Sequence, residues 1–306
     1  MNALIITLLV AALSSQTAPV GAIESNLRET VRYLTEEIGE RGYRDVGKLD
    51  KAANYIDQKL RSYGYDVKRQ AFPFQGKTYY NIIAQSKGTN PVKEEILIIG
   101  AHYDTVAGTP GADDNASGVA GLLELARLAA EKPLPRTVRF VAFSLEEPPA
   151  FGTESMGSHV YAKSLSEEGV KVRGMISLEM VGFFCDSKDC QGYPFSCIGW
   201  FYPDKGEYIA LVGNRHSKTF TKELKKAFSA VSSVPLETLN APSFVTGVDF
   251  SDHRNLWKFG FPAVMATDTS FYRNPHYHRE TDTAGTLDYR KTAELVTGLA
   301  EALRGL

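Results

Sequence analysis

Segments typical of buried strands and segments typical of amphipathic helices alternate through the middle of the chain. The clearest of them is the continuous aliphatic run Ile96–Ile99, which is typical of a strand covered on both faces. The apolar pattern predicts strands at 65–72, 78–84, 96–99, 137–143, 172–180, 208–212 and 262–266, and helices at 24–39, 52–60, 119–130, 155–165, 218–231 and 289–303. Because strands separated by helices form mostly parallel sheets, the sequence predicts the α/β class, with a three-layer α/β/α sandwich around a mostly parallel mixed sheet.

Length and composition are those of one folded domain. The chain has 306 residues, of which 43% are hydrophobic and 23% are charged, and it contains no repeat and no shift in composition that would mark a linker. The formal net charge of −2 provides no positive field to attract nucleic acid. We therefore expect a single domain with no nucleic-acid partner.

The N-terminus has features of an export signal. An apolar run occupies residues 1–13, small and polar residues follow, and Val20-Gly21-Ala22 resembles a cleavage site, although no Lys or Arg precedes Arg28. The run is too short for an ordinary transmembrane helix. The sequence predicts a signal peptide at 1–22, a single domain at 23–306, and a secreted or periplasmic protein without stable membrane insertion. The alternative is an odd N-terminal segment that is buried or disordered.

Three cysteines, Cys185, Cys190 and Cys197, lie close together in a stretch that contains Gly, Pro and Asp. They lack the C-x-x-C spacing of zinc knuckles and thioredoxin-like redox sites. In an exported protein, one local disulfide with one cysteine left over is expected. Three unpaired thiols in a surface segment are the alternative, and both interpretations stay open.

Histidines and carboxylates lie at the ends of the predicted strands. His102 follows the 96–99 strand, and Asp104, two residues later, lies on the same face and can orient the imidazole. The other groups are Asp113-Asp114 before a predicted helix, Glu146-Glu147 after a strand, Glu179 at a strand end, and His276 and His278 near the C-terminus. Each has a structural explanation when it is taken alone, such as helix capping by Asp114. Two adjacent carboxylates are costly, however, unless water or a cation neutralises them.

Together, these residues predict a metal centre. The carboxyl ends of parallel strands meet at one edge of the sheet, where ligands gather. Imidazole and carboxylate ligands suit zinc. Two zinc ions about 3.5–4 Å apart, bridged by one carboxylate and a water, would use three carboxylates and two imidazoles. The predicted metal ligands are His102, Asp114, Glu147, Glu179 and His278.

At these residues the sequence closely resembles the di-zinc aminopeptidase family, which includes the secreted bacterial leucyl-type aminopeptidases and is related to the glutamate carboxypeptidases and glutaminyl cyclases. The resemblance extends from about Ile96 to Thr283, in the order of the family's motifs. The matching motifs are His102-Tyr103-Asp104, Gly111-Ala112-Asp113-Asp114-Asn115-Ala116-Ser117-Gly118, Glu146-Glu147, Leu178-Glu179-Met180-Val181-Gly182, Ser251-Asp252-His253, and Tyr277-His278 followed by Asp282.

The resemblance implies a role for each ligand: His102 and Glu179 on one zinc, Glu147 and His278 on the other, and Asp114 bridging both. The family usually has Asp where this chain has Glu179. Glutamate can still coordinate zinc, but its extra methylene shifts the metal or the backbone. The spacing of the ions and the end of the substrate that is cleaved are therefore less constrained.

The resemblance also implies two catalytic residues. Glu146 would be the general base, and Tyr277 would donate a hydrogen bond to the developing oxyanion; packing of the Tyr277 ring beside His278 is the alternative. A cis peptide bond is implied between Asp114 and Asn115. Asp252 and the histidine after it are expected close to the rim of the site.

The function expected from the residues and the resemblance is that of a zinc-dependent exopeptidase. It would hydrolyse N-terminal residues from peptides through a metal-bridging water and a Glu general base, as a monomer. The alternatives within this fold are a carboxypeptidase and a glutaminyl cyclase. A metal-free binding module is disfavoured, because all five ligand positions hold competent residues. The sequence does not determine side-chain specificity.

Overall fold

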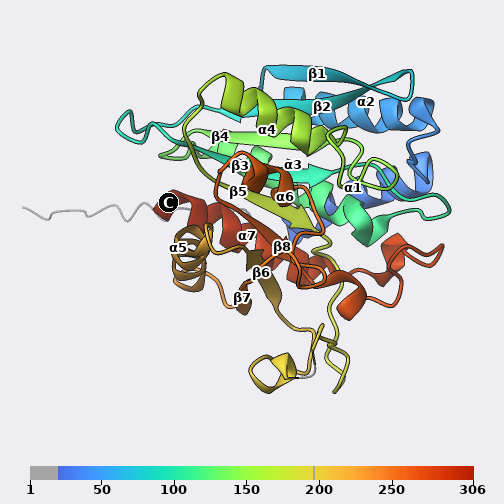
Figure 1. The fold of residues 1–306 in the computed structure, drawn as a ribbon, viewed down its shortest axis with the longest axis vertical. Helices are drawn as coiled ribbons and strands as arrows, with labels where there is room; N and C mark the ends of the chain where they lie inside the picture. The colour runs from blue at the N-terminus through green and yellow to red at the C-terminus, as the bar shows by residue number, and fades with distance from the viewer. Residues whose placement is uncertain (1–19, 196) are drawn as a thin grey trace, which may run out of the picture.

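The structure is a computed structural model that describes residues 20–195 and 197–306. Its centre is one eight-stranded sheet in the order β1-β2-β4-β3-β5-β8-β6-β7 (Figure 1). The strands are β1 (Val67–Phe74), β2 (Lys77–Ser86), β3 (Ile96–His102), β4 (Val138–Phe143), β5 (Val172–Glu179), β6 (Ile209–Gly213), β7 (Leu236–Asn240) and β8 (Ala263–Thr267). The α-helices are α1 (Val20–Arg32), α2 (Val46–Ser62), α3 (Gly118–Glu131), α4 (Gly157–Glu167), α5 (Lys218–Ser229), α6 (His253–Lys258) and α7 (Tyr289–Gly305).

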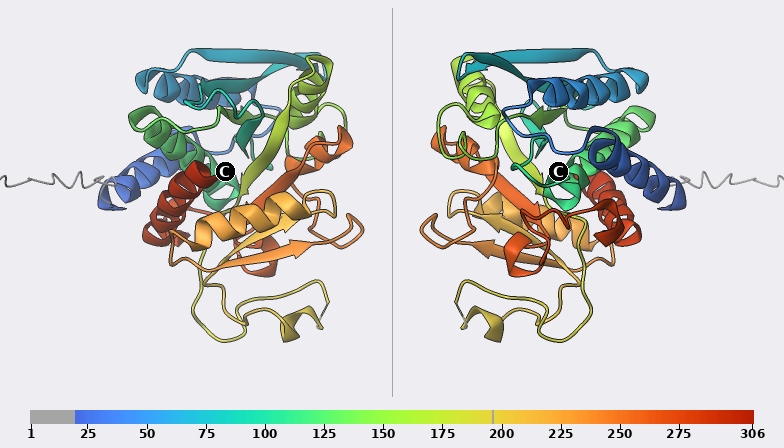
Figure 2. Two further views of the ribbon diagram at one scale, coloured as in Figure 1. Left: turned by 90° about the vertical axis from the view of Figure 1, so that its left-hand side faces the viewer. Right: turned by 90° about the vertical axis from the view of Figure 1, so that its right-hand side faces the viewer.

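Helices cover both faces of this sheet, which confirms the predicted three-layer sandwich (Figure 2). Helices α1, α2, α3, α5 and α7 pack together over one face, and α4 and α6 pack over the other. Strands β4, β3, β5 and β8 are adjacent and parallel. The β1–β2 hairpin and the β6–β8 pair are antiparallel, so the sheet is mixed, as predicted.

The aliphatic run in β3 is explained by its central position. Leu97 and Ile99 pack into the core under α3, and Ile96 and Ile98 pack into the smaller core under α4. Alternate side chains of a strand point to opposite faces, so a strand covered on both sides must be apolar throughout. Every predicted strand and helix is present in the structure, with ends shifted by a few residues.

One strand and one α-helix of the described residues were not predicted. Strand β7 has the sequence Leu-Glu-Thr-Leu-Asn and lies at the edge of the sheet, where partly exposed polar residues remove the apolar signal. Helix α6 has six residues, which is too short to display a helical period. Both elements matter for the site described below, because β7 lines its cavity and α6 follows Ser251-Asp252.

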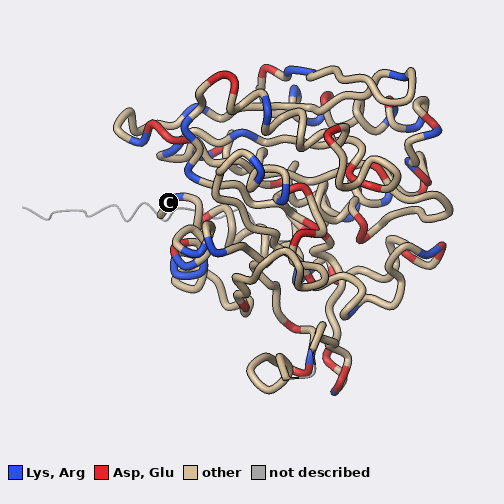
Figure 3. The backbone as a smooth tube through the Cα atoms, in the orientation of Figure 1, with Lys and Arg blue, Asp and Glu red and all other residues tan. Residues whose placement is uncertain are grey.

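The predicted signal peptide lies almost entirely outside the described residues, and it stays a prediction. Val20-Gly21-Ala22, the expected cleavage region, forms the first turn of α1. Within the described residues, the longest apolar helical stretch falls short of what a membrane crossing requires. Lys and Arg are interspersed with Asp and Glu in the view of Figure 3, as the near-zero net charge suggests.

A long excursion, residues 183–208, connects β5 to β6 and projects from the lower edge of the molecule in Figure 1. Cys185 and Cys190 form a disulfide within it, and Cys197 is a free, exposed thiol. One local disulfide with one cysteine left over was one of the two interpretations of the sequence. The structure therefore favours it over three unpaired thiols.

Arg41 connects the N-terminal helices to the loops that follow β3. Its guanidinium is fully buried, and it donates hydrogen bonds to backbone carbonyl oxygens at distances of 2.8–3.0 Å. The acceptors are the carbonyls of Leu34, Gly39, Tyr103, Pro110 and Gly111. Burial lowers the pKa of Arg41 to about 10, so the side chain stays charged at neutral pH.

Replacing Arg41 with Met should lower the free energy of unfolding by about 3–5 kcal/mol, because several buried carbonyls lose their donor. Chemical denaturation followed by circular dichroism measures this change. Arg44→Met is the matched control, since Arg44 is exposed and its Nε donates only to the neighbouring Tyr43 hydroxyl. Equal stabilities of the two variants would show that Arg41 does not hold these loops.

Candidate metal centre

The carboxyl ends of three neighbouring parallel strands form one rim. His102 is the last residue of β3, Glu179 is the last residue of β5, and Glu146-Glu147 follow β4 closely. Strand β3 lies between the other two, and its register pairs His102 with Phe143. The order of the strands therefore brings together groups that are far apart in the sequence.

Two further groups reach this rim from loops. Asp114 lies in the short segment Ala112–Ser117 that leads into α3, at a point where the backbone is not helical. His278 lies in the segment between β8 and α7 and has a positive φ of 56°. The peptide bond between Asp114 and Asn115 is cis, as the resemblance implied.

Asp114 lies between the two imidazoles. Its Oδ1 is 3.3 Å from His102 Nε2, and its Oδ2 is 3.1 Å from His278 Nε2. On one side, His102 Nε2 is also 3.3 Å from Glu179 Oε2. On the other side, His278 Nε2 is 3.5 Å from Glu147 Oε2. The structure thus brings all five predicted ligands together, in two groups that share one carboxylate.

The charges of this cluster influence one another strongly. Burial raises the pKa of Asp114, but hydrogen bonds from the two imidazoles outweigh burial and hold that pKa below its usual range. Burial, with the nearby charge of Asp114, raises the pKa of Glu147 to about 7. Burial lowers the pKa of His278, but the adjacent carboxylates outweigh it and raise the value to about 10. The buried carboxylates and imidazoles therefore shift one another's pKa values, because they lie close together away from water.

These residues fit zinc. Their donor atoms are imidazole nitrogens and carboxylate oxygens, which zinc binds in proteins. One donor atom each from His102, Asp114 and Glu147 lie within 4.8 Å of one another. Glu147 Oε1 is buried and has no hydrogen-bond partner among the described residues. A bound cation would satisfy this oxygen and neutralise the excess of carboxylates.

Asp104 connects the end of β3, which carries His102, to the loop after β4, which carries Glu146 and Glu147. Its Oδ1 and Oδ2 accept hydrogen bonds from the backbone N–H groups of Glu146 and Glu147, both at 3.1 Å. Its carboxylate also lies 3.6 Å from His102 Nδ1, and its carbonyl oxygen lies 3.2 Å from the same nitrogen. The sequence suggested the contact with the imidazole. It contained no sign of the contacts with Glu146 and Glu147.

A second aspartate acts in the same way on the loop that carries Asp114. Asp282 accepts hydrogen bonds from the backbone N–H groups of Asp113 and Asp114, at 2.9 and 3.1 Å. The side chain of Asn115 donates to the carbonyl of Leu178 at 2.8 Å, which ties the loop to the end of β5. Backbone and side-chain hydrogen bonds therefore determine where Asp114 lies.

Ser251 belongs to a motif of the resemblance, but the sequence analysis assigned it no role in the site. Its hydroxyl donates a hydrogen bond of 2.7 Å to Glu179 Oε2 and lies 3.1 Å from the Ser177 hydroxyl. The Ser251-Asp252-His253 motif therefore adjoins the site through its serine. Asp252 and His253 are fully buried.

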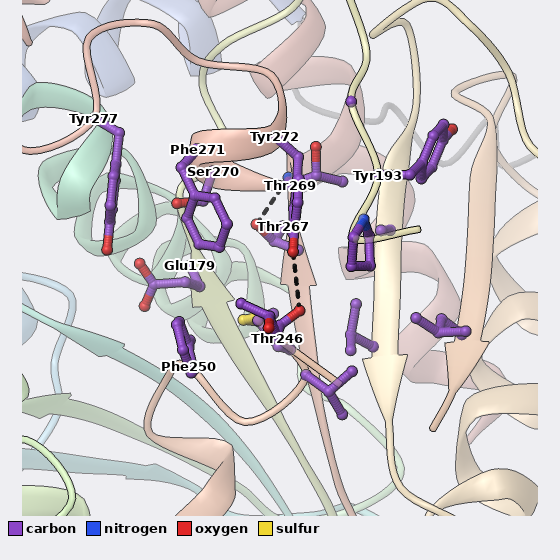
Figure 4. A pocket seen from close by; sticks show the side chains of 18 of the residues that line it. Glu179, Tyr193, Thr246, Phe250, Thr267, Thr269, Ser270, Phe271, Tyr272 and Tyr277 are labelled. Atoms are coloured by element: carbon purple, nitrogen blue, oxygen red, sulfur yellow. Dashed lines mark hydrogen bonds between the residues drawn. The ribbon is translucent and has the colours of Figure 1, made fainter. Parts of the chain in front are cut away.

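The predicted catalytic residues both line a cavity next to this cluster. Glu146 is buried, and burial raises the pKa of its carboxyl well above the usual range. The Tyr277 ring stacks on the His278 ring with a centroid distance of 3.7 Å. The ring therefore packs beside His278, as the alternative to a catalytic role expected. In Figure 4 the Tyr277 hydroxyl points toward the Glu179 carboxylate, so the ring packing leaves that hydroxyl facing the cavity.

Much of the chain matches a described family of sequences. The model for "Peptidase family M28" matches residues 81–303. The chain is 42% identical to the uncharacterized protein YfbL of Escherichia coli K12, over 94% of this chain and 90% of that protein. It is 28% identical to the probable aminopeptidase YDR415C of Saccharomyces cerevisiae, over 71% of this chain and 54% of that protein.

Solved structures share the fold at low sequence identity. A zinc aminopeptidase from Bacillus subtilis superposes with a TM-score of 0.75 at 17% identity, covering 94% of this chain and 95% of that one. A glutaminyl cyclase from Fimbriiglobus ruber superposes with a TM-score of 0.73 at 21% identity, covering 95% and 97%. Enzymes with two different activities thus have this fold, so the fold alone does not identify the reaction.

Replacing Asp104 with Asn should lower zinc affinity by about 10–100-fold, because the amide can accept only one of the two N–H bonds and lacks the charge beside His102. Competition with a chromophoric chelator measures this affinity. Asp66→Asn is the matched control, because the Asp66 side chain is fully exposed and its ion-pair partner is Arg61 in α2, which is not a residue of the rim. An Asp104→Asn protein with the affinity of the control would exclude this supporting role.

Proposed function

Because the chain belongs to peptidase family M28, we propose that it is a two-zinc aminopeptidase that removes N-terminal residues from peptides. The observation that carries this proposal is the position of Asp114, whose two oxygens each face a different imidazole. A carboxylate in this position suits a bridge between two ions. Water and peptide carbonyls are the groups that such a pair activates in hydrolysis.

The proposed ligands divide into two groups around Asp114. His102 and Glu179 would hold one zinc, and His278 and Glu147 would hold the other, as their distances to the shared carboxylate suggest. When bound, zinc supplies Lewis acidity, which polarises a carbonyl and lowers the pKa of water to about 7. The remaining parts of the reaction fall to side chains of this chain.

Glu146 is the proposed general base. It adjoins Glu147 in the sequence, lines the cavity and takes part in no ion pair among the described residues. Burial raises the pKa of its carboxyl, which suits a group that must accept a proton near neutral pH. Glu146 would take a proton from the attacking water and deliver a proton to the leaving amine.

Tyr277 is the proposed oxyanion donor. Stacking on His278 restricts its ring, and its hydroxyl makes no hydrogen bond within the described residues. Burial, together with the charges of Asp114 and Glu147, raises the pKa of this hydroxyl, so it keeps its proton. A protonated hydroxyl can donate to the negative oxygen that develops on the scissile carbonyl.

The charges around the cavity favour a free amine over a free carboxylate. Carboxylates line its inner end, and no Lys or Arg lines it in the part of the chain that the structure describes. An N-terminal ammonium can pair with such carboxylates, whereas a C-terminal carboxylate requires a cation. This supports an aminopeptidase over a carboxypeptidase.

Glutaminyl cyclase activity is the second candidate, because enzymes of that name share the fold. The family resemblance associates the cyclases with one zinc, whereas the shared carboxylate here suits two. We further propose that the protein acts outside the cytoplasm as a monomer. The Cys185–Cys190 disulfide supports an oxidising compartment, and residues of a single chain make up the candidate site.

Replacing Glu146 with Gln should reduce kcat at least about 1,000-fold while zinc stays bound, because the amide cannot accept the proton from water. Hydrolysis of an aminoacyl anilide measures kcat, and mass spectrometry measures the zinc content. Glu168→Gln, an exposed change outside the cavity, should keep full activity. Near-normal turnover by Glu146→Gln would remove Glu146 from the role of base.

A panel of substrates separates the candidate reactions. The protein should cleave free-amine aminoacyl anilides, should lose this activity on treatment with a zinc chelator, and should regain it when zinc is added. N-blocked peptides and N-terminal glutamine peptides test carboxypeptidase and cyclase activity. Release of a C-terminal residue from N-blocked peptides, or formation of pyroglutamate without cleavage, would overturn the aminopeptidase proposal.

A further inference from the structure

The excursion between β5 and β6 ends in a segment that carries no charge. From Gln191 to Pro203 the sequence contains no Asp, Glu, Lys or Arg, and the charged residues of the excursion lie on either side of this stretch. Figures 1 and 2 show the excursion, in yellow, standing away from the rest of the molecule. We call residues 194–203 the tip of the excursion.

The tip exposes large aromatic side chains. Trp200 is 81% exposed, Phe201 is 82% exposed and Phe195 is 54% exposed. They lie close together in the sequence, whereas the apolar residues on an ordinary protein surface are scattered. Ile198 lies between them and lines the cavity beside the metal centre, but Trp200 and Phe201 are not among the described residues that line it. The exposed rings therefore have no part in forming the cavity.

Hydrogen bonds and ring contacts hold the tip in place. Arg273 is buried and donates to Gln191 Oε1 and to the carbonyl of Tyr208, both at 2.8 Å, so it ties the two ends of the excursion together. The rings of Tyr193 and Tyr202 lie across the base of the tip, with a centroid distance of 6.0 Å. A group that is presented in this way loses little conformational freedom when it binds.

The backbone of the tip satisfies its own polar groups. The N–H groups of Ile198, Trp200 and Phe201 donate to backbone carbonyls within the tip, at 3.0–3.3 Å. Pro194 and Pro203, at its two ends, have no N–H. An unpaired N–H is costly in a lipid environment, so a turn with internal hydrogen bonds enters lipid at a smaller cost than an extended loop.

The size of this surface favours a lipid bilayer over a second copy of the chain. A fully covered aromatic side chain buries about 150–250 Å², so three rings that are 54–82% exposed offer about 300–550 Å². Each partner in a stable dimer buries about 800 Å² over about 20–30 residues. A charged partner would find no ion-pair group on the tip. Aromatic rings on a projecting segment, in contrast, suit the boundary between headgroups and acyl chains.

From these observations we propose that the tip docks the protein reversibly on a lipid bilayer, with Trp200, Phe201 and Phe195 in the interfacial layer. A few inserted rings give reversible adsorption and not a membrane-spanning anchor. Because Ile198 lines the cavity, a docked tip brings the cavity next to the lipid surface. Peptides whose free N-termini are held at that surface are then its substrates, and this last step rests on the proposed function.

Vesicles of zwitterionic phosphatidylcholine test the docking. The wild-type protein should co-sediment with them, and Trp200→Asp should lower the partition constant by about tenfold or more, because a carboxylate replaces the ring in the interfacial layer. Trp200→Phe keeps a ring and should bind like the wild type. Val92→Asp places the same charge on an exposed apolar residue between β2 and β3, and it should also bind like the wild type. The apolar run at residues 1–13, where it is retained, contributes equally to every variant.

The fluorescence of Trp200 reports its own surroundings. The chain has two tryptophans, and Nε1 of Trp257 donates to Ser217 Oγ and to the carbonyl of Ala263. In Trp257→Phe the remaining emission should shift to shorter wavelengths when vesicles are added, because the indole leaves water. The wild-type protein should show the same shift at smaller size, so the measurement does not depend on the folding of this variant.

Four results would overturn the docking. They are no binding by the wild-type protein, equal binding by Trp200→Asp, an emission spectrum that vesicles leave unchanged, and binding that is lost when the salt concentration is raised from about 0.1 M to about 1 M, since salt screens ionic contacts and leaves apolar contacts intact. A dimer that Trp200→Asp abolishes would also overturn it, by identifying a second copy as the occupant.

A peptide with a free N-terminus and a C-terminal acyl chain, embedded in the vesicles, tests the position of the cavity. Trp200→Asp should lower kcat/KM for this peptide by about tenfold and leave kcat/KM for a soluble aminoacyl anilide unchanged, because Trp200 lies outside the cavity. Equal kcat/KM of the two proteins for the embedded peptide would overturn the role of the tip in reaching substrate. Wild-type protein that cleaves neither substrate would overturn the proposed function, and the vesicle measurements would still decide the docking.

Discussion

The concentration of buried carboxylates at one edge of the sheet is the constraint on which the rest of this structure depends. Asp114, Glu146, Glu147 and Glu179 are only 3–6% exposed, and Asp114, Glu147 and Glu179 each lie 3.1–3.5 Å from an imidazole nitrogen. Buried charges of one sign destabilise a fold unless cations or hydrogen-bond donors compensate them. The two imidazoles compensate in part, and zinc would supply the remaining positive charge.

One type of hydrogen bonding, from pairs of backbone N–H groups to an aspartate, holds the residues of this cluster in position. Aspartates that are not proposed metal ligands accept pairs of backbone N–H bonds: Asp104 from residues 146 and 147, and Asp282 from residues 113 and 114. Each carboxylate thereby joins one loop to another and is itself satisfied. Ser251 and Asn115 extend the same network to Glu179 and β5. A metal centre held in this way needs little reorganisation when an ion binds.

The cavity and the metal centre depend on the same segment of chain. The loop after β8 carries Arg273, which fastens the excursion, and a few residues later Tyr277 and His278. The shape of the cavity and the activation of a peptide bond are thus connected through one short stretch. Tyr277 lies where the two meet, because it stacks on His278 and also contacts Phe271, which lines the cavity.

The sequence by itself determined the fold class, nearly all the strands and helices, and the group of residues that could bind metal. These follow from apolar periodicity and from short motifs, in which the informative residues lie close together in the chain. Only the tertiary structure revealed Arg41, Ser251 and Arg273 as supports and Ala210 as part of the cavity lining. Most of their partners lie tens of residues away, and the cavity is lined by several separate segments. Contacts between distant residues leave no periodic signal, so they become visible only when strand order and loop packing bring the segments together.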